Sequence, residues 1–137
     1  TYFWNAHRNE ARGIGGLFFD YCKATDAMTM DNWFNFVSEV GNSFLEAYVP
    51  IVEKRKNLPY TAENRTWQEI RRGRYVEFNL VHDKGTLFGL KTNGRIESIL
   101  MSLPPHVQWV YDHHAEAGSA EEKLVNVLEN PKNWIVD

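Results

Sequence analysis

The stretch "YVEFNLVHDKGTLFGL", residues 75–90, decides the fold class because it alternates apolar and polar residues more clearly than any other part of the chain. In an extended segment, Val76, Phe78 and Leu80 fall on one face and the residues between them on the other. The residues "HDKG" have turn chemistry, and "TLFGL" resumes the extended pattern. The sequence therefore predicts an antiparallel hairpin over residues 75–90.

A strand and two helices are predicted before this hairpin. The apolar run "IGGLFFD", residues 14–20, is short and carries glycines, which is typical of a buried strand with room for close approach. Apolar residues recur at spacings of three and four over residues 31–54, so a long amphipathic helix is expected there, and Pro50 should kink or end it. Thr61 is a candidate N-cap for a second helix, and Gly73 is placed to terminate that helix.

A short helix is predicted after the hairpin, in "KTNGRIESILMSLPP", residues 91–105. Four apolar residues of this stretch share one face of a helix: Ile96, Ile99, Leu100 and Leu103. The helix should begin near Arg95, and Pro104 and Pro105 should end it because proline cannot continue the hydrogen-bond ladder.

The last predicted helix covers residues 119–128. Ser119 stands three residues before Glu122, which is the spacing of a capping box. Strands and helices are therefore interspersed along the chain, which predicts the α+β class, with an antiparallel β-sheet flanked by α-helices.

Composition limits the kind of protein this is. A chain of 137 residues is long enough for one domain with a core, and 43% apolar and 14% aromatic residues distinguish it from disordered chains. The formal charge of −3 argues against nucleic acid or an anionic membrane as a partner. Cys22 is the only cysteine, so no intrachain disulfide can form and a reducing compartment is expected. No apolar stretch has the length of a membrane span.

Asn93, Gly94 and Arg95 open the predicted helix of residues 95–103 and are a candidate anion site. The first turn of a helix has unpaired N–H groups at the positive end of the helix dipole, and a guanidinium stands beside them here. A tight Asn-Gly turn followed by an exposed arginine explains the same residues without a ligand. The sequence leaves both interpretations open.

Two other polar clusters also have two interpretations. Arg71, Arg72 and Arg74 either form a solvated helix end or bind a phosphate or carboxylate. Glu77 and Asn79 make one face of the predicted strand polar, so that face either meets water or lines a cavity.

The glycines of "ARGIGGLFFD" lead into an apolar run instead of following one, which argues against a dinucleotide-binding loop.

The five histidines show no spacing that would bring two metal ligands to one helix face. A metal site made within this chain alone is therefore not expected. His7, close in sequence to Arg8, Arg12 and the glycines, has the strongest case for function among the histidines, although a surface or core role explains it more simply.

Three longer segments carry a resemblance to a known family. They are "HRNEARGIGGLFFD" (residues 7–20), "FLEAYVPIVEKRK" (residues 44–56) and "RRGRYVEFNLVHDKGTLFGLKTNGRIESILMSLPP" (residues 71–105). Through them the chain resembles the oxygen-dependent coproporphyrinogen III oxidases of haem biosynthesis along essentially its whole length. Family members are considerably longer, so the resemblance implies that residues 1–137 are the C-terminal portion of a single oxidase domain whose upstream half is absent.

The resemblance implies oxidative decarboxylation of two of the four propionates of coproporphyrinogen III, which gives protoporphyrinogen IX. Molecular oxygen is the implied co-substrate, and carbon dioxide and hydrogen peroxide leave. No organic cofactor is implied, whereas a divalent metal has been proposed for some bacterial members, with the histidine that matches His7 among its suggested ligands.

The resemblance also implies where the substrate and a second subunit bind. The family's substrate-binding Gly-Gly-Arg corresponds to Asn93, Gly94 and Arg95, and asparagine tolerates the left-handed backbone of the glycine that it replaces. The dimer-forming region corresponds to residues 75–111, so a homodimer is expected. The implied fold is a large, flat antiparallel sheet covered by helices on both faces.

No catalytic residue is assigned in this chain, because the family's proposed proton-donating histidine and its glycine-rich segment lie upstream. The chain is therefore expected to supply propionate binding and dimer contacts, and to be inactive alone. The alternative is a noncatalytic fragment that only binds anionic tetrapyrroles or mediates dimerisation. A cytoplasmic location is expected, with the mitochondrial intermembrane space as the other option.

Overall fold

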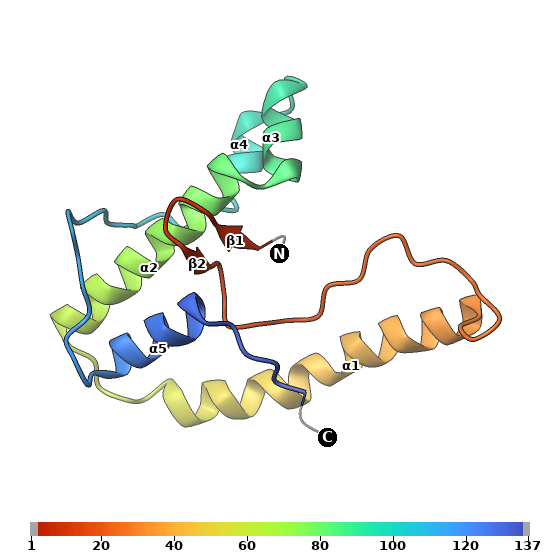
Figure 1. Ribbon diagram of the computed structural model, residues 1–137, viewed down its shortest axis with the longest axis horizontal. Helices are drawn as coiled ribbons and strands as arrows, with labels where there is room; N and C mark the ends of the chain where they lie inside the picture. The colour runs from red at the N-terminus through yellow and green to blue at the C-terminus, as the bar shows by residue number, and fades with distance from the viewer. Residues whose placement is uncertain (1–2, 136–137) are drawn as a thin grey trace. The chain divides into compact units, whose positions relative to one another are not determined.

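The computed structural model describes residues 3–135, and the chain forms two compact units (Figure 1). Unit 1 combines Thr1–Gly16 with Thr61–Asp137, and unit 2 is Leu17–Tyr60. Unit 2 contains the helix α1, Met30–Arg55. Unit 1 contains two strands and four helices among its described residues: β1 Trp4–Asn5, β2 Glu10–Ala11, α2 Ala62–Val81, α3 Lys84–Lys91, α4 Ile96–Leu100 and α5 Ala120–Glu129.

The helix α1 confirms the amphipathic helix predicted for residues 31–54. Thr29 caps it by accepting a hydrogen bond from the backbone N–H of Asn32, whose side chain accepts from the N–H of Thr29 in return. Pro50 does not end the helix, which continues to Arg55. None of the side chains of α1 is buried, so this helix has a long apolar surface with little covering it within unit 2.

The helix α2 replaces the first strand of the predicted hairpin, so the hairpin over residues 75–90 is wrong. Thr61 and Asn64 form a capping box that starts α2, and the helix passes through Gly73 and on to Val81. No proline interrupts it, and its buried residues follow a helical spacing: Ile70, Gly73, Val76, Phe78 and Asn79. The local alternation of residues 75–81 was a weaker determinant of secondary structure than the capping box at Thr61 and the proline-free stretch that follows it.

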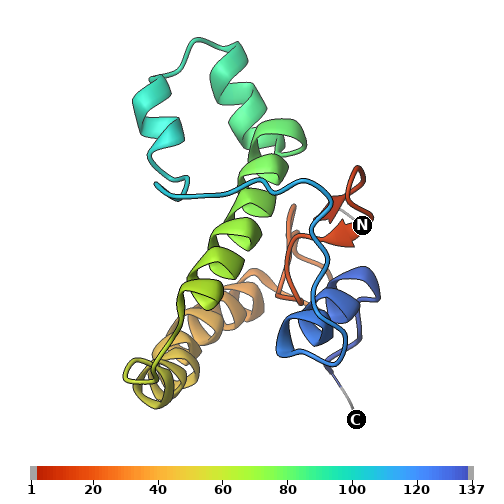
Figure 2. The same ribbon diagram turned by 90° about the vertical axis from the view of Figure 1, so that its left-hand side faces the viewer.

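The residues "HDKG" begin a helix and do not form a hairpin turn. Asp83 accepts a hydrogen bond of 2.7 Å from the backbone N–H of Thr86 and thereby caps α3. The helices α3 and α4 then lie side by side (Figure 2), with Gly89 so near Ile99 that an added Cβ would lie 2.9 Å from the isoleucine Cδ1. As predicted, α4 begins directly after Arg95, but it ends at Leu100, before the two prolines are reached.

The only sheet among residues 3–135 is small and forms where the sequence predicted no strand. Trp4 pairs with Ala11 and Asn5 with Glu10, in antiparallel order. These strands and the helices agree with the α+β class, although the sheet is far smaller than expected.

The strand predicted over residues 14–20 is not formed. Gly15 has a φ of 156°, in the region that only glycine adopts readily. The close approach expected at this glycine does occur, because an added Cβ would lie 2.9 Å from the ring of Trp134. The indole Nε1 of Trp134 donates a 2.5 Å hydrogen bond to the carbonyl of Ile14, which holds the two segments together.

The core of unit 1 lies where α2 and α5 meet the strands. Ile70 and Phe78 of α2 and Leu128 of α5 are almost fully buried. The predicted last helix is confirmed as α5, and Ser119 caps it by accepting from the N–H of Glu122 at 3.0 Å. None of the helices within residues 3–135 has both the length and the apolar character needed to cross a lipid bilayer.

Gly73 is the position in α2 where a larger side chain should be most disruptive. A Cβ at this residue would lie 2.8 Å from the backbone carbonyl oxygen of Gln108, which cannot move as a side chain would. We expect Gly73→Ala to lower the free energy of unfolding by about 1–3 kcal/mol despite the better helix propensity of alanine. Urea unfolding of the chain followed by circular dichroism measures this. Gly41→Ala in α1 is the control, because nothing lies within 4 Å of its added Cβ.

Candidate functional site

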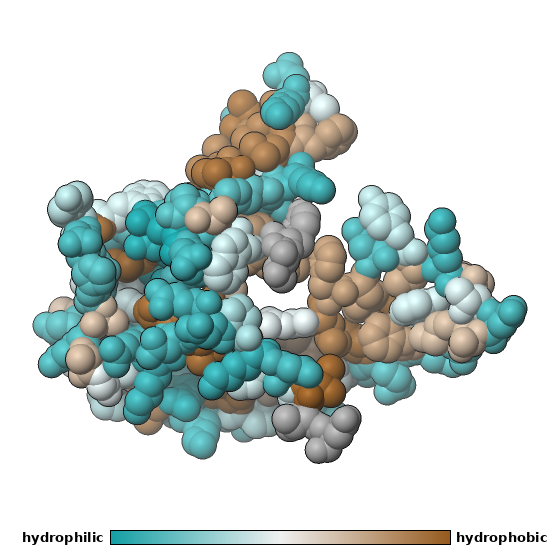
Figure 3. All heavy atoms as spheres, viewed as in Figure 1, coloured by the Kyte–Doolittle hydropathy of each residue, from teal (hydrophilic) through white to brown (hydrophobic). Residues whose placement is uncertain are grey.

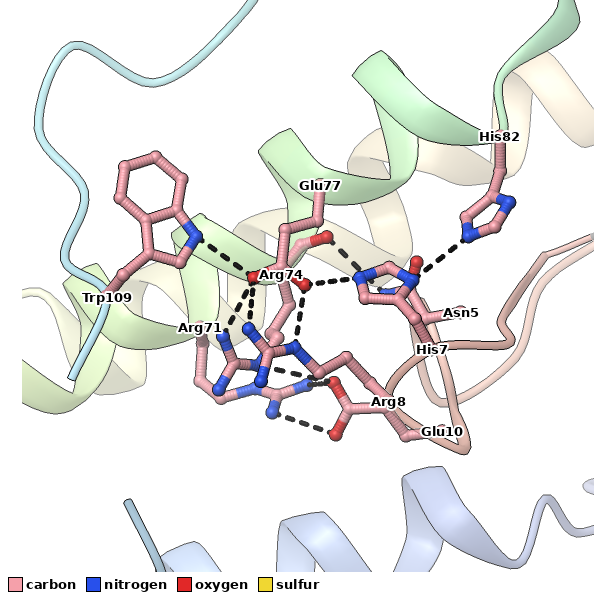
Figure 4. A network of polar contacts seen from close by, with 9 residues as sticks. All are labelled: Asn5, His7, Arg8, Glu10, Arg71, Arg74, Glu77, His82 and Trp109. Atoms are coloured by element: carbon pink, nitrogen blue, oxygen red, sulfur yellow. Dashed lines mark hydrogen bonds and ion pairs between the residues drawn. The ribbon is translucent and has the colours of Figure 1, made fainter. Parts of the chain in front are cut away.

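The largest polar network in unit 1 joins the β1–β2 hairpin to one face of α2 (Figure 4). The hairpin turn and β2 supply His7, Arg8 and Glu10, and the strand pairing fixes their backbone positions. The network also contains six residues from β1, α2 and the segments after it: Asn5, Arg71, Arg74, Glu77, His82 and Trp109.

The Glu77 carboxylate is the centre of this network. Its two oxygens accept hydrogen bonds from Arg8 at 2.7 and 2.9 Å and from the Nε2 of His7 at 2.8 Å. Arg74 donates at 3.0 Å and the indole of Trp109 at 2.9 Å. The side chain of Glu77 is only 12% exposed, so water contributes little to its solvation.

These donors keep Glu77 ionised. Burial alone would raise the pKa of Glu77, but the hydrogen bonds from Arg8 and His7 and the charge of Arg74 outweigh it and lower the pKa from 4.5 to about 2. The same contact raises the pKa of Arg8. Burial is the main cause that lowers the pKa of Arg74. Glu77 is therefore a fixed negative charge at neutral pH.

Glu10 is the second buried carboxylate of the network. Arg71 donates to both of its oxygens, at 2.9 and 3.0 Å, and Arg74 lies 3.9 Å from one of them. The fork of Arg71 thus binds this carboxylate in the bidentate geometry that makes such pairs strong. Three arginines and two carboxylates leave the network with one formal positive charge, apart from its histidines.

His7 uses both ring nitrogens within the network. Its Nε2 lies 2.8 Å from Glu77, and its Nδ1 lies 3.1 Å from the Nε2 of His82. Because Glu77 is an acceptor, His7 Nε2 carries a proton, so in neutral His7 it is His82 that donates to Nδ1.

The residues around His7 do not fit a metal centre. Within residues 3–135 no group of three or more histidine, cysteine or acidic side chains is arranged to hold a metal ion. A metal on His7 would also have to displace Glu77 or His82. His7 therefore belongs to the polar network around Glu77.

A cavity of about 250 Å³ adjoins the arginine side of the network. Arg8, Arg71 and Arg74 line it together with His113 and His114. The carboxylates that these arginines already bind belong to the same chain, so the cavity is not an open anion site. The arrangement is best suited to fastening the N-terminal hairpin to α2.

The two clusters with open interpretations take different roles in the structure. Arg71 and Arg74 do bind carboxylates, but these are Glu10 and Glu77 of the same chain. Asn79 is 9% exposed and donates to the carbonyl of Tyr75, so its amide is buried and paired within α2. The sequence offered a signal for this pairing, since the charges of "HRNE" and of "RRGRYVE" are complementary, but it did not reveal that the two segments meet.

Asn93, Gly94 and Arg95 lie between α3 and α4, and none of them belongs to the polar network around Glu77. Asn93 has a φ of 61°, and the N–H of Gly94 donates to the carbonyl of Gly89 at 2.9 Å, so the turn is closely defined. Arg95 is exposed, and its side chain makes no hydrogen bond or ion pair with any residue from 3 to 135. Because α4 has only five residues, its dipole adds little, and any anion binding here depends on the guanidinium.

Comparison with known proteins shows similarity to one family over nearly the whole chain. Residues 1–134 match a family described as Coproporphyrinogen III oxidase. The chain is 54% identical over 134 residues to the oxygen-dependent coproporphyrinogen-III oxidase, chloroplastic, of Hordeum vulgare. Its identity is also 54% to the protein of the same name from Glycine max and to coproporphyrinogen-III oxidase 1, chloroplastic, of Arabidopsis thaliana.

These matches cover 98% of the chain but 34% of each relative, so the chain spans about a third of the length of the relatives it matches.

The names of the relatives correct the expected location of the protein. All of them are called chloroplastic, so the expectation of a cytoplasmic or mitochondrial location is wrong. Nothing in the amino-acid sequence of these 137 residues carried that information.

Proposed function

Because the chain belongs to the coproporphyrinogen III oxidase family, we propose that it is the C-terminal portion of an oxygen-dependent coproporphyrinogen III oxidase. The complete protein would convert coproporphyrinogen III to protoporphyrinogen IX in porphyrin biosynthesis. The observation that carries this proposal is the family match over residues 1–134, supported by 54% identity to relatives named for this activity. The relatives' names support a plastid location for it as well.

The proposed reaction consumes one molecule of oxygen for each propionate. The side chain –CH2–CH2–COOH loses carbon dioxide and becomes –CH=CH2, and its two electrons and two protons reduce oxygen to hydrogen peroxide. No organic cofactor enters this balance. This chain contributes by positioning the substrate, since a well-positioned, electron-rich porphyrinogen reacts with oxygen more readily.

Asn93, Gly94 and Arg95 are the proposed propionate-binding residues of this chain. Two observations support the assignment: the resemblance of "TNGR" to the family's substrate-binding segment, and the exposed guanidinium of Arg95 without a carboxylate partner among residues 3–135. The left-handed Asn93 and the close packing of Gly94 against Gly89 hold the turn in one conformation, so Arg95 begins from a defined position.

Residues 75–111 are the proposed contact with a second copy of the protein. Large apolar side chains are exposed in this region: Val81, Phe88, Ile96, Met101, Trp109 and Tyr111. Figure 3 shows such apolar atoms gathered over α3 and α4, at the top of the view. A surface of this kind favours a protein partner over water. We further propose that the large flat sheet typical of the family is completed in the full-length homodimer.

A noncatalytic role is the second candidate, because the chain spans about a third of its relatives and contains no assigned catalytic residue. In that case it binds anionic tetrapyrroles, or holds a dimer together, without turnover.

Formation of protoporphyrin fluorescence from coproporphyrinogen III, in air, separates the two candidates. We expect the full-length protein to produce the signal and residues 1–137 alone to produce none. Adding the missing segment in trans should restore part of the activity if this chain supplies propionate binding. A full-length protein that leaves coproporphyrinogen III unchanged would disprove the proposed function.

A further inference from the structure

We propose that Arg12 is a second carboxylate-binding residue, which holds another propionate of the same tetrapyrrole. The inference rests on the proposed function, because that function supplies a substrate with more carboxylates than Arg95 can bind. Arg12 follows β2 directly, and its backbone N–H donates to the carbonyl of Phe3 at 2.8 Å. The position of the residue is therefore fixed by the same pairing that forms the hairpin.

Aromatic rings surround the guanidinium of Arg12. Its Cζ lies 4.8 Å from the ring centre of Phe78 and 5.1 Å from those of Phe3 and Tyr75. Contacts of this kind stabilise the cation through the ring faces. They leave the N–H groups at the edge of the guanidinium plane unused, and these are the groups that bind a carboxylate.

Arg12 differs from its neighbours in lacking an acidic partner. Arg8, Arg71 and Arg74 each form an ion pair with Glu10 or Glu77. Arg12 forms no ion pair or side-chain hydrogen bond with residues 3–135, although it is more than half buried. A half-buried cation that is held rigidly and keeps free donors is preorganised for an anion from outside.

The backbone directly after Arg12 is open. Nothing lies within 4 Å of a Cβ built on Gly13, the following residue, so a ligand can approach the backbone of Gly13 closely. The aromatic surroundings lower the local polarity, which strengthens a charge-assisted bond to a carboxylate. The chemistry selects a carboxylate or a similar planar anion attached to an apolar body, as a tetrapyrrole propionate is.

The test compares variants of the full-length protein in two measurements. The first is the Kd for coproporphyrin III, the stable oxidised form of the substrate, from quenching of protein fluorescence. The second is kcat and KM with coproporphyrinogen III. For Arg12→Gln we expect Kd and KM to rise about 10- to 100-fold while kcat changes less than about threefold. Arg12→Lys keeps the cation but loses the planar fork, so a rise of about 3- to 10-fold is expected.

Arg72→Gln is the matched control. Arg72 lies on α2, is also partly buried and has no ion pair among residues 3–135, but no aromatic ring packs on its guanidinium. The Kd of the Arg72→Gln variant for coproporphyrin III should therefore stay within about twofold of that of the parent protein. Wild-type Kd and KM in both Arg12 variants would overturn the proposal. If Arg12→Gln fails to fold, Arg12→Lys decides alone. If the parent protein binds no coproporphyrin III, the proposed function fails. If the parent protein and both Arg12 variants bind coproporphyrin III equally well, this inference fails and the proposed function stands.

Discussion

Glu77→Gln is expected to lower the free energy of unfolding of the chain by about 3 kcal/mol at pH 7. Folding lowers the pKa of this carboxyl from 4.5 to about 2, and each pKa unit corresponds to about 1.4 kcal/mol. Glutamine removes the negative charge and leaves Arg8 and Arg74 with donors aimed at a neutral group. Urea unfolding at a series of pH values measures the loss.

The pH dependence identifies the cause. Because the folded-state pKa of Glu77 is the lower one, its contribution is fully present above pH 4.5 and is lost as the pH falls toward 2. The difference in stability between the parent protein and the Glu77→Gln variant should therefore be constant near neutral pH and shrink below about pH 4.5. Glu116→Gln is the control, since this exposed side chain has no ion pair among residues 3–135. A pH-independent difference would show that shape, and not charge, explains the effect.

Arg95→Ala should reduce kcat/KM of the full-length enzyme for coproporphyrinogen III about 10- to 100-fold. This is the effect of losing one charge-assisted pair of about 1.5–3 kcal/mol shielded from water. The Arg95 side chain is exposed and forms no hydrogen bond or ion pair with any residue from 3 to 135, so the free energy of unfolding should change by less than about 0.5 kcal/mol. Steady-state kinetics and urea unfolding check the two halves of this expectation.

Lys91→Ala is the matched control for Arg95. Lys91 is also exposed and basic, and it ends α3 on the other side of the same turn. If both variants lose activity equally, the turn attracts the substrate through general positive charge. If Arg95→Ala retains the parent kcat/KM, the assignment of residues 93–95 as the propionate site is wrong.

The helices with strong boundary signals could be predicted from the sequence. Ser119 marks the start of α5, and the spacing of apolar residues predicted the bounds of α1 to within one residue at each end. Such signals are local, because a cap and a helical face need only neighbouring residues.

The hairpin over residues 75–90 was wrong because its signal is ambiguous without tertiary context. The same residues alternate as a strand would, but as part of α2 they bury Val76 and Phe78 in the core of unit 1. The sequence predicts a helix end at Gly73, whereas in the structure α2 continues through Gly73 and the backbone of Gln108 packs closely against it. Only the contact across the fold distinguishes these roles.

The polar network could not be predicted for a related reason. Glu10 and Arg71, like Arg8 and Glu77, are more than sixty residues apart, so no spacing rule connects them. Arg95, by contrast, stood out through a local motif. A motif within a single turn can be proposed from a sequence, whereas residues that meet only through folding cannot.

The division of unit 1 into Thr1–Gly16 and Thr61–Asp137 has a consequence for synthesis on the ribosome. The β1–β2 hairpin emerges before α2 and α5, yet the surfaces that it contacts belong to these two helices. Until α2 is translated, Glu10 lacks its arginine partners and Arg12 lacks the rings of Tyr75 and Phe78. The nascent hairpin segment must therefore remain unassembled while Leu17–Tyr60 passes through the exit tunnel, a period in which protection by chaperones would count most.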